Sequence, residues 1–106
     1  MTGTAGQIEW AEEIKARVNA EFDRVAKALE SAAEKQIEPD QTDTRDVIAI
    51  LEDKRAEVMA KDQAGYFIVE WQELRDQVRL LIANDSRYEA IRARKGSTLL
   101  KEGKKL

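Results

Sequence analysis

The chain has 106 residues, with 18 Lys and Arg against 21 Asp and Glu, and it has neither Cys nor His. This length fits a single domain, and the 37% of charged residues leave room only for a thin apolar core. Without Cys and His there are no disulfides, thiolate nucleophiles, Ser-His-Asp triads or imidazole metal ligands. Any catalysis would have to rest on carboxylates, Lys, Tyr or a metal held by carboxylates.

The first residues carry neither a basic segment nor an apolar run, so the sequence predicts no secretory signal. The longest runs of large apolar residues, 47–51 and 66–69, are far shorter than the about 20 residues of a bilayer span. We therefore expect a cytoplasmic protein that does not contact a membrane.

A long helix is predicted at the start of the chain. Thr4 and Gln7 have the spacing of a capping box, in which each side chain accepts a hydrogen bond from a free backbone N–H. Apolar residues then recur at steps of three or four, as one stripe of a helix requires: Ala11, Ile14, Val18, Phe22, Val25, Leu29 and Ala32. Pro39 disfavours a helical conformation at Glu38, so we expect the helix to cover residues 5–36.

Two further helices follow after short polar connections. The second is predicted over residues 43–61. Asp62 is positioned to cap the third, in which apolar residues step by four and three: Phe67, Trp71, Leu74, Val78 and Leu81. Asn84 and Asp85 interrupt this pattern and mark the end of the third helix.

Ser86 and Glu89 repeat the capping-box spacing and predict a short fourth helix over 87–95, ended by Gly96 and Ser97. Short connections favour antiparallel neighbours. The predicted fold is all-α: an antiparallel three-helix bundle with a long first helix, a short C-terminal fourth helix and a basic tail. Its domain covers residues 1–96, and residues 97–106 form a flexible basic tail.

The first predicted helix spans about 32 residues and the next two about 20 each, which leaves about 15 Å of the first helix beyond its neighbours. Part of its apolar stripe would then stay uncovered, unless the fourth helix folds back over it or a second chain binds there. Trp10, Ile14 and Tyr66 form the expected interaction surface, although Trp10 and Tyr66 also suit packing at the end of the bundle. The leading interpretation is a non-enzymatic module without cofactor that binds itself as a homodimer, or another protein.

Charge is distributed unevenly along the chain. Residues 1–86 carry 11 basic and 19 acidic side chains, whereas residues 87–106 carry seven basic and two acidic ones. A basic segment of this kind can neutralise nucleic-acid phosphates. The candidate contacts are Arg87, Arg92, Arg94, Lys95, Lys101, Lys104 and Lys105. In the competing interpretation the segment folds onto its own acidic bundle.

Acidic residues recur at a spacing of three or four on two predicted helices. Glu9, Glu12 and Glu13 lie on the first, and Glu70, Glu73 and Asp76 lie on the third. Carboxylates are the usual Mg²⁺ ligands, and this pattern resembles the all-α nucleoside-triphosphate pyrophosphatases. The resemblance implies Mg²⁺-dependent nucleotide hydrolysis. The competing interpretation is that both groups are solvated helix faces, since the chain has 21 acidic residues.

The run Gln-Ile-Glu-Trp-Ala-Glu-Glu-Ile-Lys at residues 7–15 resembles the start of an uncharacterised family of small bacterial and phage proteins. That family also carries an aromatic-aromatic-Ile-Asp-x-Arg segment, to which Tyr66, Phe67 and Ile68 correspond. Val69 and Trp71 stand in place of its Asp and Arg. The resemblance implies a helical fold and a bacterial or phage source, but no activity.

Overall fold

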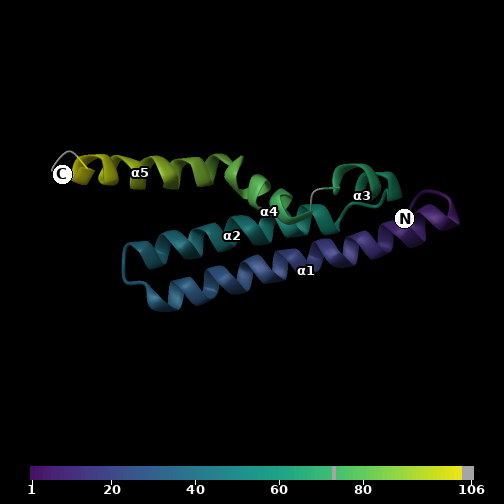
Figure 1. Ribbon diagram of the computed structural model, residues 1–106, viewed down its shortest axis with the longest axis horizontal. Coiled ribbons are helices and arrows are strands. Elements are labelled where there is room, and N and C mark those ends of the chain that lie inside the picture. Colours follow the sequence, from purple (N-terminus) through teal and green to yellow (C-terminus); the bar gives the residue numbers. More distant parts are fainter. Residues whose placement is uncertain (73, 104–106) are drawn as a thin grey trace.

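The computed structural model describes residues 1–72 and 74–103, with side chains given for all of these except 75 and 95–103. This part of the chain forms five helices, α1 (Ala5–Lys35), α2 (Asp40–Met59), α3 (Ala64–Glu70), α4 (Leu74–Ala83) and α5 (Ser86–Gly103). Its extended pairing is limited to one isolated bridge between Thr2 and Gln63. The all-α class is thereby confirmed. The molecule is elongated, with extents of 60 × 24 × 19 Å (Figure 1).

The first helix forms as predicted, within one residue at its C-terminus. Thr4 accepts a hydrogen bond from the Gln7 backbone, and the Gln7 side chain accepts one from the Thr4 backbone at 2.9 Å, which completes the capping box. α1 then buries one stripe, in which Val18 and Phe22 are fully covered. None of the described helices is both long and apolar enough to cross a membrane.

α1 and α2 form an antiparallel hairpin, which lies in the lower part of the view in Figure 1. The side-chain amide of Gln41 donates to the Ala33 carbonyl at 2.9 Å, and the Thr44 hydroxyl donates to the Gln36 side chain at 2.6 Å. These two bonds tie the start of α2 to the end of α1. α2 begins at Asp40, three residues before the predicted start.

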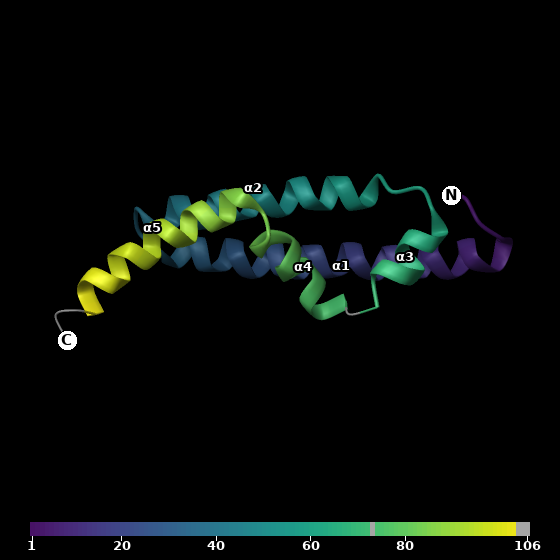
Figure 2. The same ribbon diagram turned by 90° about the horizontal axis from the view of Figure 1, so that it is seen from above.

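The predicted third helix is wrong, because the chain breaks between α3 and α4. Trp71 leaves helical geometry with φ −110° and ψ 50°. If the predicted third helix were continuous, its apolar residues would all face one neighbouring helix. Here α3 packs on α1, whereas α4 packs on both α1 and α2. Because of the break, α3 and α4 run in different directions (Figure 2).

The starts of α3 and α5 differ from the capping that the sequence predicts. Gln63, not Asp62, precedes α3 and makes no capping side-chain bond. Asp62 instead accepts a backbone hydrogen bond from Thr2 at 2.8 Å through its carbonyl. At α5 the cap is Asp85 rather than Ser86, since its carboxylate accepts from the Arg87 backbone N–H at 2.9 Å.

α5 is longer than the predicted 87–95, since its backbone stays helical to Gly103. The predicted stop at Gly96 is wrong because a glycine inside a helix costs only about 1 kcal/mol relative to Ala. The flexibility of the tail over 97–106 and the domain boundary at residue 96 remain predictions. Residues 104–106 lie outside the described residues.

The predicted overhang of α1 is covered by the chain itself. α2 has 20 residues and α1 has 31, but α3 packs on α1 beyond the end of α2. Ala64 and Phe67 of α3 are fully buried there, together with Ala11 of α1. The N-terminal part of the stripe therefore needs neither the fourth helix nor a second chain to cover it.

Candidate interaction surfaces

An apolar groove lies where α1, α2, α4 and α5 meet, and we call it the α1–α4 groove. It has a volume of about 470 Å³. Its lining comes from the C-terminal half of α1 and from the three other helices: Arg24, Val25, Ala28, Leu29, Val47, Arg79, Ile82, Ala83 and Tyr88. Within the described residues α5 packs on α2 and α4 rather than on α1.

Two arginines, Arg24 and Arg79, line this groove, and they differ in their partners. The Nε of Arg24 donates to both carboxylate oxygens of Glu21, at 3.0 and 3.1 Å, and these bonds raise the pKa of Arg24. Arg79 of α4 is exposed, and no ion-pair partner is found for it among the described side chains. The groove thus combines apolar walls with the positive charge of Arg79, whereas the charge of Arg24 is balanced by Glu21.

The three residues of the expected interaction surface lie in different environments. Trp10 is 55% exposed on α1. Ile14 is half-buried and packs against the core, so it belongs mainly to the interior. Tyr66 is also half-buried: its ring meets Phe67 edge-to-face at 5.1 Å, and the Lys61 ammonium lies 5.4 Å from its centroid. Only Trp10 presents most of its side chain to solvent.

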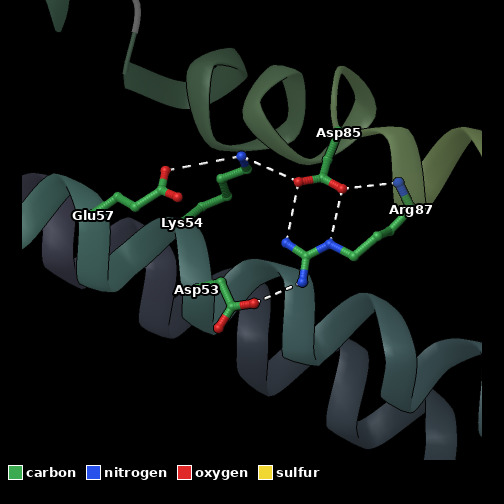
Figure 3. A network of polar contacts seen from close by, with 5 residues as sticks. All are labelled: Asp53, Lys54, Glu57, Asp85 and Arg87. Carbon is green, nitrogen blue, oxygen red and sulfur yellow. Dashed lines mark hydrogen bonds and ion pairs between the residues drawn. The ribbon is translucent and has the colours of Figure 1, made fainter.

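Arg87, a candidate nucleic-acid contact, lies in an ion-pair network on the chain's own helices (Figure 3). Its guanidinium contacts Asp85 at 3.0 Å and Asp53 of α2 at 2.7 Å, and Lys54 of α2 contacts Asp85 at 3.1 Å. The side-chain and backbone hydrogen bonds from Arg87 lower the pKa of Asp85 well below its ordinary value. The two aspartates in turn raise the pKa of Arg87.

Arg94 makes a second link of this kind, pairing with Asp43, a buried residue of α2. Arg92 is exposed. The side chains of Lys95 and Lys101 lie outside the described ones, and so do residues Lys104 and Lys105. Two of the seven candidate basic residues therefore bind the acidic α2, as in the interpretation that this segment folds onto its own bundle. Nucleic-acid binding remains a prediction.

The acidic residues do not gather into a site in the part of the chain with described side chains. Glu9, Glu12 and Glu13 are exposed on α1, and Glu70 and Asp76 are exposed on α3 and α4. No three acidic side chains among those described come close enough to hold a metal ion. Glu73 lies outside the described residues.

Sequence reasoning missed the α1–α4 groove because two of its lining residues, Val25 and Leu29, fit the apolar stripe predicted for the first helix. Val25, Leu29 and Val47 are only half-buried in the structure. The one signal in the sequence was the interruption at Asn84 and Asp85, which ends α4 before it can cover the rest of α1.

Comparisons of the chain with protein-family models, with curated proteins and with solved structures found no match. The resemblance of residues 7–15 to small bacterial and phage proteins therefore remains an expectation.

Proposed function

We propose that this chain is a non-enzymatic helical module that acts by protein–protein contact and that it forms a homodimer. The observation that supports this function is the α1–α4 groove, which is largely apolar, open to solvent and has a volume of about 470 Å³. Apolar grooves of this kind commonly receive a helix or an aromatic anchor from a partner. Burial of Val25, Leu29 and Tyr88 would provide the hydrophobic driving force.

The oligomeric state in solution tests the proposal directly. We expect sedimentation velocity over a range of concentrations to give a dimer that dissociates on dilution. A particle that keeps the 12.0 kDa mass of the monomer at every concentration contradicts the homodimer.

Substitution in the groove tests where the contact lies. Ala28 lines the groove and is exposed, so Ala28→Arg places a long charged side chain in the binding surface without disturbing the core. We expect this variant to be monomeric. Ala56→Arg is the matched control, because Ala56 is an exposed alanine of α2 that does not line this groove. The control should dimerise like the natural chain, and equal dimerisation of both variants contradicts the role of the groove.

A further inference from the structure

The last helix, α5, buries little apolar surface against the rest of the molecule. Among its residues with described side chains, Ile91 is buried and Tyr88 is half-buried, whereas the others are exposed. Within the described residues α5 packs on α2 and α4 and on no other helix. Hydrophobic stabilisation grows with the apolar area removed from water, so these contacts hold α5 only weakly.

Two arginines of α5 pair with acidic residues of α2. Arg87 contacts Asp53 at 2.7 Å, and Arg94 contacts Asp43. The two arginines are about two turns apart, so they lie on one face of α5. Their partners occur in the reverse order along α2, which makes the two helices antiparallel. The arginine side chains are 50% and 61% exposed, so water and dissolved salt reach both ion pairs.

The two helices are loosely packed between these ion pairs. They leave a groove of about 390 Å³, which we call the α2–α5 groove, and its lining includes Ala49 and Ile50 of α2 with Ala90 and Ile91 of α5. Protein interiors are normally close-packed, and side chains that line a gap lose part of their van der Waals contacts. The docked position of α5 therefore depends on the two arginines more than on side-chain packing.

A connection of two residues, Asn84 and Asp85, joins α4 to α5 and is placed to act as a hinge. The Asp85 carboxylate caps α5 by accepting from the Arg87 backbone N–H, and Lys54 of α2 contacts the same carboxylate at 3.1 Å (Figure 3). The cap lies within the start of α5, so the helix keeps it when α5 turns away from α2. Asp85 thus marks the point about which α5 can turn.

The position of α5 also shapes the α1–α4 groove. Tyr88 lines that groove and comes from the first turn of α5. The other lining residues belong to α1, α2 and α4. If α5 turns away from α2, Tyr88 leaves the wall of the groove while the rest of the lining stays in place.

We propose that α5 is a hinged helix that Arg87 and Arg94 hold against α2, and that it is released as a unit about Asn84 and Asp85 when these ion pairs are broken. The other four helices keep their fold on release. Because the docked helix places Tyr88 in the wall of the α1–α4 groove, release weakens the contact that a partner makes there. This last step rests on the proposed self-association, whereas the release of α5 does not.

A distance between α1 and α5 measures the release. The natural chain has no Cys, so Ala20→Cys on α1 and Ala93→Cys on α5, both at exposed positions, each take one spin label. Pulsed electron paramagnetic resonance of labelled chain in excess unlabelled chain then reports distances within one chain. We expect a narrow distribution at low salt. Ala93 lies about 12 Å along α5 from Asp85, so release should shift and broaden the distribution by several ångström.

Neutralisation of the two arginines tests their role. We expect Arg87→Gln combined with Arg94→Gln to give the broad distribution even at low salt. Arg45→Gln combined with Arg92→Gln is the matched control, because these two arginines are exposed on α2 and α5 and do not line the α2–α5 groove. The control should keep the narrow distribution. A narrow distribution at the natural distance in the Arg87→Gln and Arg94→Gln variant overturns the proposal.

Salt tests the release without any substitution of the arginines. In about 1 M NaCl the Debye length falls to about 3 Å, and we expect the distance from α1 to α5 to broaden in the labelled chain. A second pair of labels, at Ala20→Cys and Ala56→Cys on exposed positions of α1 and α2, should keep its distance. If the distance from α1 to α5 stays narrow, or if both distances change together, α5 is not released as a unit and the proposal is overturned.

Sedimentation velocity of unlabelled chains separates this proposal from the proposed function. Arg87→Gln combined with Arg94→Gln should raise the dimer dissociation constant at least tenfold, and the control pair should not. Release of α5 together with natural dimerisation overturns the effect on the groove and leaves the homodimer standing. A monomeric natural chain overturns the homodimer and the effect on the groove, and the distance from α1 to α5 then decides the release alone.

Discussion

The rings of Phe22 and Trp71 pack at 6.1 Å between centroids, with an angle of 59° between their planes. Phe22 lies in the middle of α1, and Trp71 lies at the break between α3 and α4. Both side chains are buried. This contact fixes the point at which the chain changes direction, and it thereby places α4 where it forms one wall of the α1–α4 groove.

Removal of the Trp71 ring should therefore destabilise the fold strongly. We expect Trp71→Ala to lower the free energy of unfolding by about 3–5 kcal/mol, as truncation of a buried aromatic does. Trp10→Ala removes the same side chain from a site that is 55% exposed, and it should change stability by less than about 0.5 kcal/mol. Urea unfolding followed by circular dichroism, at a concentration where the chain is monomeric, checks both. If both variants lose the same free energy of unfolding, Trp71 does not stabilise the break between α3 and α4.

The Asp85 carboxylate should make the free energy of unfolding depend on pH in the acidic range. Its pKa in the folded chain lies below the ordinary 3.8, because Arg87 donates side-chain and backbone hydrogen bonds to it. Ionised Asp85 therefore stabilises the fold above about pH 4, and this contribution is lost as the pH falls towards the lower, folded pKa. Asp85→Asn keeps a capping side chain without the charge. We expect it to be less stable than the natural chain at pH 7 and the difference to shrink below pH 4. If the difference in stability between the natural chain and Asp85→Asn does not vary with pH, the charge of Asp85 is not what stabilises the fold.

Gly3 and Gly6 should respond in opposite directions to the same substitution. Gly3 has a φ of +142°, and a Cβ there would meet the Ala64 side chain at 3.0 Å. We expect Gly3→Ala to destabilise the fold by about 1–3 kcal/mol. Gly6 lies inside α1 and a Cβ there would meet nothing within 4 Å, so Gly6→Ala should stabilise by about 0.5–1 kcal/mol. Thermal unfolding of both variants measures this, and a stabilised Gly3→Ala would contradict the prediction.

The capping box at the start of α1 should contribute to stability through the Thr4 hydroxyl. Thr4→Ala leaves the Gln7 backbone N–H without its acceptor and should lower stability by about 1 kcal/mol. Thr2→Ala is the control, because the Thr2 hydroxyl makes only a long bond, 3.4 Å, to the Asp62 carbonyl. The measurement is the midpoint of urea unfolding for each variant. A larger loss for Thr2→Ala than for Thr4→Ala would contradict this role of the cap.

The elements that sequence could predict are those set by local chemistry. α1 follows from a capping box at its start, from an apolar stripe, and from Pro39 beyond its end. The break at Trp71 could not be predicted, since the residues around it continue a helical pattern. It arises from tertiary packing, in which Trp71 contacts Phe22 from a non-helical position.

The candidate surfaces were predictable only in part, for a similar reason. The sequence indicated that Trp10 lies beside the apolar stripe, and its side chain is largely exposed. It placed the uncovered part of α1 near Ile14, but α3 packs on that end of the helix, and the open groove lies near Val25 and Leu29 instead. Which end is covered depends on the path of the chain after Lys61, and periodicity does not reveal that path.

The four-residue connection between α1 and α2 also has a consequence for the order of assembly during refolding. A short loop brings two helices together at a small entropic cost, so this hairpin should form early. The later helices can then dock on a template that already exists, with α3 reaching one end and α4 the middle. Variants that slow refolding should therefore cluster in the hairpin, whereas those in α4 should mainly speed unfolding.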